Sequence, residues 1–282
     1  LMLDLFKYKS DVNDMIVYEN GHVVREYRER SGFLYEQFSI TKSFVSTLLG
    51  IAIDEGYINV DQKLSFYFKD NLCDVNRTFF ENISLRDVLT MSRGYKKGML
   101  FAHERKTINN YLDYCLKLPL SKNKTFIYSN VNAYLIGVII EKATGWKLID
   151  YMDKKLFAPL DIKNYEYETS PEGYFFGASG LKISTYDFLK LGVLYLNKGV
   201  YNEKMIVSSR FIEDATSNKI DANKKGCGYG YFWWVNENGS YMASGKYGQI
   251  CFVNPKKSIV VSVNSNLHKS DVLIDYLLDK FK

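Results

Sequence analysis

The stretch FSITKSFVSTLLGIAIDEG, residues 38–56, indicates a reactive serine at the start of a buried helix. Its apolar residues fill more than one helical face, so we expect a core helix rather than a surface one. Gly56 is the residue type that commonly follows a helix end. Ser39 then lies at the cap or in the first turn, where free backbone N–H groups favour developing negative charge. Lys42 lies one turn further along, on the same face.

The spacing of Ser39 and Lys42 has a chemical use. A serine hydroxyl becomes a good nucleophile when a base takes its proton, and lysine is a base only when neutral. For a lysine in water at pH 7, reaching the neutral form costs roughly 4–5 kcal/mol. Burial against the apolar helix, or a second cation nearby, would remove much of this cost. We therefore predict that Ser39 is a nucleophile; the alternative is a helix cap beside a solvated lysine.

The same Ser-x-x-Lys spacing also occurs at Ser121/Lys124 and Ser179/Lys182. The first pair lies in the polar run SKNK and the second in the glycine-flanked run GASGLK. Neither begins a long apolar helix, so the context favours Ser39 over both.

The composition limits the class of protein. A chain of 282 residues can hold one large domain or two lobes that share a core. The net charge of +5 is spread along the sequence, so we expect no nucleic-acid partner. No apolar run approaches the length of a membrane span. The three histidines are far apart and lack metal-binding spacing, so we expect no metal.

The cysteines favour a reducing compartment. None of the four has C-x-x-C spacing, and we interpret them as free thiols (Cys73, Cys115, Cys227 and Cys251). No signal peptide is visible, so we expect a cytoplasmic protein. The chain starts at Leu1, however, which is compatible with removal of an upstream segment.

The order of predicted elements indicates the fold. Runs rich in valine, isoleucine and tyrosine flank Asn20-Gly21 and predict a β-hairpin. The middle of the chain is mostly helical, and Asn130 begins a helix that ends before Gly145. Four strand-like runs then follow, YGYFWWVN, GSYMASG, QICFVNP and SIVVSVNSN, and Ser270 caps a terminal amphipathic helix.

These elements predict an α/β (α+β) fold. One antiparallel sheet is built from both chain termini and flanked by helices, and it carries an inserted, mainly helical lobe. We expect residues 1–58 with 222–282 to form the sheet lobe and residues 59–221 to form the helical lobe. A site between the two lobes follows naturally.

With these motifs, the sequence resembles the serine hydrolases of the β-lactamase and penicillin-binding-protein superfamily. It is most similar to the class C-like branch, which includes esterases, D-amino-acid peptidases and 6-aminohexanoate-dimer hydrolase. Ser39-Ile-Thr-Lys42 matches the first motif. The likeness continues through LTMSRGY (89–95), FIYSNVNAYLIGVIIEKATG (126–145) and YGYFWW followed by ASGKYGQICFVNP. The resemblance implies a β-lactamase/transpeptidase-like fold and covers the chain from the first hairpin to the last strand.

The resemblance implies a role for Tyr128-Ser129-Asn130 as the second motif. The spacing alone is weak, since Tyr18–Asn20 and Tyr57–Asn59 share it. In the family, a tyrosine whose pKa is lowered by Lys42 would pass the serine's proton to the leaving group and later activate water. Asn130 would bind Lys42 or a substrate carbonyl. The alternatives are a packed tyrosine and a helix-capping asparagine.

The third motif departs from the β-lactamase pattern. Where those enzymes have Lys-Thr-Gly, this chain has Ala243-Ser244-Gly245, so the cation that helps to hold a β-lactam is missing. Gly245 would let the strand approach the substrate closely. The N–H of Lys246 would pair with that of Ser39 as an oxyanion hole.

Aromatic residues around the third motif are candidates for an apolar pocket. We predict that Trp233 and Tyr247 contact the substrate, with Trp234 as a further candidate; aromatic residues that alternate in a strand also occur as plain core. Ser244 and Lys246 complete the predicted substrate-binding set.

The sequence therefore predicts a serine hydrolase that acts on an ester or amide of a small molecule or short peptide through an acyl-enzyme. The catalytic set is Ser39, Lys42 and Tyr128, and no cofactor or metal is required. The alternatives are a weak β-lactamase, a D-amino-acid peptidase, and a non-catalytic sensor that binds peptidoglycan fragments or β-lactams.

Overall fold

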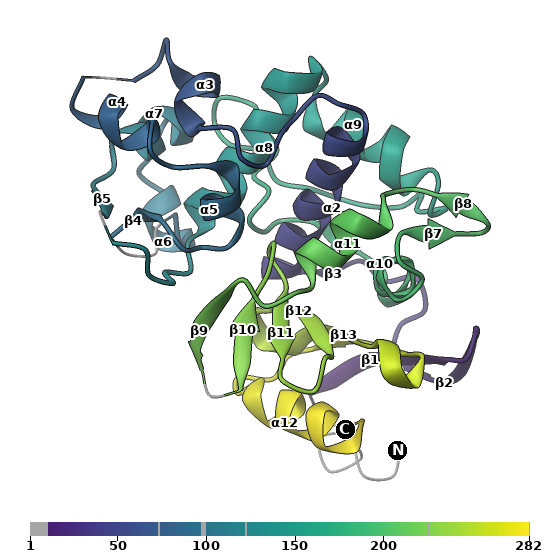
Figure 1. The fold of residues 1–282 in the computed structure, drawn as a ribbon. Helices are drawn as coiled ribbons and strands as arrows, with labels where there is room; N and C mark the ends of the chain where they lie inside the picture. Colours follow the sequence, from purple (N-terminus) through teal and green to yellow (C-terminus); the bar gives the residue numbers. More distant parts are fainter. Residues whose placement is uncertain (1–10, 73, 97–99, 122, 225, 282) are drawn as a thin grey trace.

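A computed structural model describes residues 11–72, 74–96, 100–121, 123–224 and 226–281 (Figure 1). Within these residues, one eight-stranded antiparallel sheet has the strand order β2-β1-β14-β13-β12-β11-β10-β9. Its strands are β1 (Val12–Glu19), β2 (His22–Arg28), β9 (Ile220–Lys224), β10 (Cys227–Tyr229), β11 (Trp234–Asn236), β12 (Tyr241–Gly245), β13 (Gln249–Asn254) and β14 (Ile259–Ser265).

The first and the last strand in the sequence are neighbours in this sheet. Strand β1 pairs with β14, and Val17 lies opposite Val261. The hairpin of β1 and β2 turns at Asn20 and Gly21, both with positive φ (49° and 94°), which is typical of an Asn-Gly hairpin turn. The prediction of a single sheet assembled from both termini is confirmed.

Helices cover both faces of the sheet. Helix α10 (Thr185–Leu196) contacts β14, β13 and β1 on one face. The C-terminal helix α12 (Asp271–Lys280) packs on the other face, where Leu273 and Leu277 join a separate apolar cluster with Phe252 and Val261 (Figure 1). Burial on both faces explains why residues 250–253 of β13 and 259–261 of β14 are apolar without alternation.

Helix α2 (Thr41–Asp54) lies at the centre of the molecule, and every residue from Thr41 to Ala52 is buried (Figure 1). Its buried hydroxyls bind carbonyl oxygens of the segment that joins β10 to β11. Ser43 Oγ donates to Phe232 O (2.8 Å), and Ser46 Oγ donates to Tyr231 O (2.6 Å). These bonds fix the helix relative to the sheet, and its apolar residues pack against the helical part of the chain.

The middle of the chain is mainly helical, as predicted. Its longest helix, α8, contacts α2 and begins after Ser129, whose side chain accepts a bond from Val131 N–H; Gly145 follows its end with φ 75°. The helices are α3 (Leu64–Phe68), α4 (Asp74–Phe80), α5 (Leu85–Leu89), α6 (Ala102–Arg105), α7 (Tyr111–Lys117), α8 (Asn130–Thr144), α9 (Leu148–Met152), α10 and α11 (Ser209–Ala215). Two-residue strands complete the fold: β3 (Tyr35–Glu36), β4 (Gly94–Tyr95), β5 (Leu120–Ser121), β6 (Lys182–Ile183), β7 (Val200–Tyr201) and β8 (Lys204–Met205).

One predicted strand is wrong. The run YGYFWWVN, residues 229–236, does not form one strand but the end of β10, a tight turn and β11. The turn closes through Gly230 N–H to Trp233 O (2.9 Å), and Phe232 has φ 60°. A side chain at residue 230 would lie 2.0 Å from Ala215 O, so only glycine fits this close approach.

Other predictions have mixed outcomes. Ser270 precedes α12 as predicted, but its side chain makes no capping hydrogen bond. Cys115 and Cys251 are buried free thiols, as expected, whereas Cys73 lies outside the described residues. In the described part of the chain, no helix is long and apolar enough to cross a membrane. The division into a sheet lobe (residues 1–58 with 222–282) and a helical lobe (residues 59–221) stays a prediction. Helix α10, which belongs to the range 59–221, packs on the sheet.

Candidate active site

Ser39 lies in a single 3-10 turn, Phe38–Ile40, that leads directly into α2. The residue is partly exposed. The turn begins with Phe38 at φ 47°, a left-handed conformation that non-glycine residues adopt rarely and at an energetic cost. The serine therefore stands where the sequence placed it, on a strained turn at the start of the central helix.

Lys42 follows one turn later and is buried, with 1% of its surface exposed. Its Nζ lies 3.1 Å from Ser39 Oγ. The same nitrogen donates to Asn130 Oδ1 (2.8 Å) and to the backbone carbonyl of Ala178 (2.7 Å). Three segments far apart in the sequence therefore meet at one amine.

The hydrogen bonds of Lys42 determine where the lone pair of a neutral amine would point. A neutral lysine has two N–H donors and one lone pair. The Ala178 carbonyl can only accept, and Asn130 Oδ1 is fixed as an acceptor because Asn130 Nδ2 donates to Leu100 O (3.1 Å). The two amine hydrogens are thus used by these acceptors, and the lone pair is left for the Ser39 hydroxyl. This is the orientation required of a base.

The environment of Lys42 favours the neutral form. Burial lowers its pKa to about 7, and the positive charge of Arg105 acts in the same direction. Arg105 is held by an ion pair with Glu168 (2.8 Å) and stacks over the Phe176 ring at 4.1 Å. Both effects named in the sequence analysis, burial and a second cation, are present.

Tyr128 lies on the other side of Lys42, with the centre of its ring 5.1 Å from Nζ. The ring stacks on Trp234 at a centroid distance of 5.8 Å and an angle of 17°, and Tyr229 packs edge-on against it. The Ser39 side chain is near enough to its phenol to lower the phenol's pKa slightly. The hydroxyl, amine and phenol predicted from sequence therefore lie together.

The predicted effect of Lys42 on Tyr128 is wrong. Burial raises the pKa of Tyr128 to about 12, and the nearby Ser39 side chain opposes this rise only partly. Lys42, whose pKa is about 7, is already neutral at the pH where the phenol would ionise, so it does not stabilise the phenolate. Tyr128 is thus a neutral phenol, suited to donating a proton rather than to acting as a phenolate.

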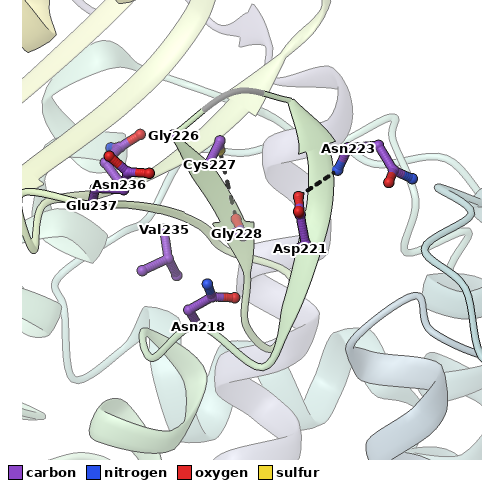
Figure 2. Close-up of a pocket in the computed structure, with 9 residues that line it drawn as sticks. All are labelled: Asn218, Asp221, Asn223, Gly226, Cys227, Gly228, Val235, Asn236 and Glu237. Atoms are coloured by element: carbon purple, nitrogen blue, oxygen red, sulfur yellow. Dashed lines mark hydrogen bonds between the residues drawn. The ribbon is translucent and has the colours of Figure 1, made fainter.

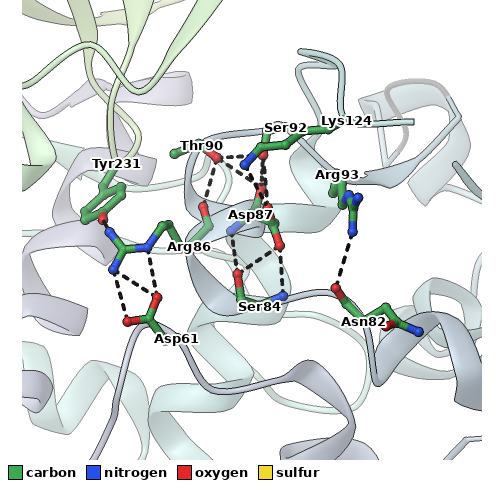
Figure 3. A network of polar contacts seen from close by, with 10 residues as sticks. All are labelled: Asp61, Asn82, Ser84, Arg86, Asp87, Thr90, Ser92, Arg93, Lys124 and Tyr231. Atoms are coloured by element: carbon green, nitrogen blue, oxygen red, sulfur yellow. Dashed lines mark hydrogen bonds and ion pairs between the residues drawn. The ribbon is translucent and has the colours of Figure 1, made fainter. Parts of the chain in front are cut away.

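The segment 89–95 holds Tyr128 in place. Met91 has φ 54°, its carbonyl accepts from Ile127 N–H (2.8 Å), and its sulfur accepts from Ser129 N–H (3.4 Å). The segment that precedes Met91 is fixed by the polar network in Figure 3. There Ser84 and Asp87 form a capping box.

The same network ties the helical part of the chain to the sheet. Arg86 pairs with Asp61 (2.9 Å) and donates to the hydroxyl of Tyr231, which belongs to the turn between β10 and β11 (Figure 3). The Tyr231 carbonyl also accepts a hydrogen bond from the Ser46 hydroxyl of α2. Arg86 therefore links the segment that holds Tyr128 to the helix that carries Lys42. The network thus orients both sides of the site.

Strand β12 ends beside the Ser39 turn. A Cβ on Gly245 would lie 2.4 Å from Gln37 O and 3.3 Å from Phe38 Cβ, so the glycine permits a close approach to the chain's own serine turn. Lys246 follows and is exposed, with Nζ 4.4 Å from the centre of the Tyr247 ring. The Tyr247 ring in turn contacts Phe38 edge-on at 5.4 Å.

The structure does not place Trp233 at the site. Its side chain is fully buried in the core, 4.2 Å from the Tyr195 ring and packed edge-on against Tyr241. Trp233 faces inward because it lies in the tight turn rather than in an alternating strand. The partly exposed Trp234, which stacks on Tyr128, takes the position beside the catalytic candidates.

The sequence reasoning missed the Ala178 carbonyl, because a backbone acceptor has no residue-type signal. Its loop carries Gly177 at φ 68° and Gly180 at φ 86°, and a Cβ on Gly177 would lie 3.3 Å from both Ala133 O and Val45 Cγ2. The loop is therefore wedged between α8 and α2. The glycine-flanked run GASG is the sequence signal for such a close-packed loop.

Two cavities lie near the end of the sheet. One of about 260 Å³ is lined by Ser244, Trp234 and the start of α12, so the Ser244 side chain faces away from Gly245 and towards this cavity. Another, of about 410 Å³, is a polar hollow between β9, β10 and β11, lined by Asn218, Asp221 and others (Figure 2). None of the residues that line the second cavity belongs to the predicted site. Among the described residues, no group of three or more His, Cys, Asp or Glu is arranged to hold a metal ion.

Comparisons with known proteins find a family model and sequence relatives. A family model described as Beta-lactamase matches residues 14–279. The 6-aminohexanoate-dimer hydrolase of Paenarthrobacter ureafaciens is 24% identical over 89% of this chain and 71% of its own length. The N-acetylmuramyl-L-alanine amidase of Bacillus subtilis (strain 168) is 26% identical over 56% of this chain, and the match spans only 38% of that longer protein.

The fold has solved counterparts. A class C beta-lactamase structure superposes with a TM-score of 0.75 at 15% identity, covering 100% of this chain and 94% of that one. At this identity the likeness concerns the fold alone. It confirms the expected architecture of a helical insert on an antiparallel sheet.

Proposed function

The chain belongs to the beta-lactamase family, and from this membership we propose that it is a serine hydrolase that cleaves an ester or amide bond through an acyl-enzyme on Ser39. The observation that carries the proposal is the hydrogen-bond set of Lys42. Two obligate acceptors use its two amine hydrogens and leave its lone pair for the serine hydroxyl. Relatives that are hydrolases by name support the reaction class.

In acylation, Ser39 Oγ attacks the substrate carbonyl carbon as Lys42 takes the hydroxyl proton. The carbonyl oxygen becomes an oxyanion, which we assign to the N–H groups of Ser39 and Lys246. As the tetrahedral intermediate collapses, the bond to the leaving alcohol or amine breaks. Tyr128 donates a proton to the leaving group, and Lys42 returns a proton to the phenol.

Deacylation runs the same steps with water. Water attacks the acyl carbon as its proton passes to Lys42, and the bond between Ser39 Oγ and the acyl group then breaks. Lys42 gives its proton to Ser39 Oγ, the acid is released, and the site returns to its starting state. Since Tyr128 is a neutral phenol with a raised pKa, we assign it the donor steps only.

The substrate class follows from what surrounds the serine. Ala243 supplies no cation where β-lactamases carry the lysine of their third motif, so we expect slow β-lactam hydrolysis at most. We propose a small-molecule or short-peptide ester or amide as the substrate. Trp234 and Tyr247 would give an apolar contact, and Lys246 a polar one.

The test is hydrolysis of p-nitrophenyl acetate, followed by a screen of short-chain esters, D-aminoacyl amides, linear amide oligomers and nitrocefin. We expect a burst of p-nitrophenol equal to the enzyme concentration, then slower turnover. Ser39→Ala should abolish both phases. Ser121→Ala is the matched control, because Ser121 has the same spacing to a lysine but lies on β5.

The outcome separates the candidate functions. Burst and turnover support the hydrolase. Binding of peptidoglycan fragments or β-lactams without any burst would support the non-catalytic sensor. Rapid nitrocefin hydrolysis would support a β-lactamase and show that Ala243 does not limit that reaction.

A further inference from the structure

Three buried amide side chains are hydrogen-bonded in series directly behind the Ser39 turn, and we call them the amide chain. Gln37 lies two residues before the serine, Asn264 lies in β14, and Gln249 begins β13. Their exposed fractions are 0%, 0% and 3%. A polar group at this depth is costly unless all its hydrogen bonds are made.

Every side-chain amide hydrogen in the amide chain has an acceptor. Gln37 Nε2 donates to the Tyr35 and Ile183 carbonyls (2.9 and 3.1 Å). Asn264 Nδ2 donates to Gln37 Oε1 (3.2 Å) and to Gln249 Oε1 (2.8 Å).

The far end of the amide chain, at Gln249, reaches the third motif. Gln249 Nε2 donates to the carbonyls of Lys246 (3.1 Å) and Ser265 (2.7 Å). Asn264 Oδ1 accepts from the Thr185 hydroxyl at 2.7 Å. The amide chain thus connects the residue preceding the Ser39 turn to Lys246 itself, without a titratable member.

The two ends of this amide chain hold two strained turns. Phe38, immediately before Ser39, has φ 47°, and Tyr247, immediately after Lys246, has φ 64°. Left-handed non-glycine residues cost of the order of 1–3 kcal/mol each and persist only where the surroundings fix them. The turns also touch, since a Cβ on Gly245 would lie 2.4 Å from Gln37 O and 3.2 Å from Gln249 Cβ.

We propose that Gln37, Asn264 and Gln249 are positioning residues that fix the spacing between the Ser39 and Lys246 turns, and with it the two N–H groups of the oxyanion hole. The inference rests on the proposed function and extends it. Asn264 is the central member, because its two N–H groups join the other two amides. Loss of that bridge lets the turns move apart while Lys42, Asn130 and Tyr128 keep their own contacts.

The test is Asn264→Leu, which removes both bridging donors in a side chain of similar size. The matched control is Asn254→Leu at the opposite end of β13, where the lost amide hydrogen bond goes to Phe281 O rather than to either turn. Both variants lose a buried amide, so both should be less stable. Only Asn264→Leu should lose activity per folded molecule.

For Asn264→Leu we expect kcat to fall by about 10- to 100-fold, in line with the effect of misplaced catalytic groups, while KM changes little. The Ki of phenylboronic acid, which forms a tetrahedral adduct with a reactive serine, should rise by the same factor as kcat/KM falls. The midpoint of the pH–rate profile should not move, because no amide titrates. A purely structural role would leave kcat and Ki of the folded fraction unchanged.

The outcomes distinguish the two proposals. A parent protein that neither hydrolyses esters nor reacts at Ser39 with a fluorophosphonate overturns the proposed function and this inference together. An active parent whose folded Asn264→Leu variant keeps the parental kcat and Ki overturns this inference alone. Should Asn264→Leu not fold, Gln249→Met, which keeps the length of the side chain but removes the donors to Lys246 O and Ser265 O, gives the same readouts with a smaller expected loss of kcat.

Discussion

The amine nitrogen of Lys42 lies 3.1 Å from the hydroxyl oxygen of Ser39, in a position where its two other contacts are both hydrogen-bond acceptors. That relationship gives the lysine one free lone pair when neutral, and directs it at the serine. Burial lowers the pKa of Lys42 to about 7, so the neutral form is substantially populated under ordinary conditions.

The rate of ester hydrolysis should rise with pH. Because Lys42 acts in its neutral form, kcat/KM should increase about tenfold per pH unit below its pKa and level off above pH 7 to 8. The measurement is kcat/KM for an ester over pH 5 to 9, corrected for spontaneous hydrolysis. A profile that is flat over this range, or that falls with rising pH, would argue against a lysine base.

Arg105 and Glu168, which form an ion pair, should shift the midpoint of the pH–rate profile in opposite directions. Arg105 lowers the pKa of Lys42 through its charge, so Arg105→Gln should shift the midpoint to higher pH. Glu168 neutralises part of that charge, so Glu168→Gln should shift it to lower pH, each by a fraction of a pH unit. The two variants control for each other, since both break the same ion pair; shifts of equal sign would exclude a charge effect.

Replacing Tyr128 by phenylalanine should separate the chemical role of the phenol hydroxyl from the packing role of the ring. The ring would keep its stack on Trp234, so the melting temperature should stay close to that of the parent. Without the phenol, proton transfer to the leaving group is lost, and kcat should fall by about 10²- to 10⁴-fold. Tyr67→Phe, which removes a hydroxyl bound to Gln62 in the mainly helical part of the chain, serves as the control and should retain full activity. A fully active Tyr128→Phe would assign the donor role to another group.

Lys42 should also leave a signature in stability. The unfolded chain keeps this lysine protonated up to about pH 10.5, whereas the folded chain releases the proton near pH 7. Between these values the unfolded state binds more protons, so raising the pH stabilises the fold by up to about 1.4 kcal/mol per pH unit. Lys42→Met lacks this group, so the parent-minus-variant difference in the free energy of unfolding should rise with pH across the window. Urea unfolding of both proteins at several pH values measures it; a constant difference would mean that Lys42 stays charged in the fold.

Much of the fold was predictable because its signals are local and strong. The Asn20-Gly21 turn, the apolar central helix and the helix that begins at Asn130 each combine a clear hydrophobic period with a specific turn or cap residue. The proximity of Ser39 and Lys42 follows from helical spacing alone. Their approach to Tyr128 came from the family resemblance, since no local rule brings the second motif to the first.

The parts that sequence did not predict depend on tertiary packing. The turn at Gly230–Trp233 interrupts what looks like a continuous strand, and it moves Trp233 into the core and Trp234 to the site. The Ala178 carbonyl is a backbone group and therefore has no signature of its own. The direction of the pKa shift of Tyr128 depends on how deeply it is buried, which residue spacing does not reveal.

The central claim, that Ser39 is an activated nucleophile, is tested most directly by labelling the folded protein with a fluorophosphonate and locating the adduct by peptide mass spectrometry. The account predicts one adduct per chain on Ser39, formed faster as the pH is raised through 7 and strongly slowed in Lys42→Met. An unmodified Ser39 in the folded protein, or an adduct on another residue, would contradict it.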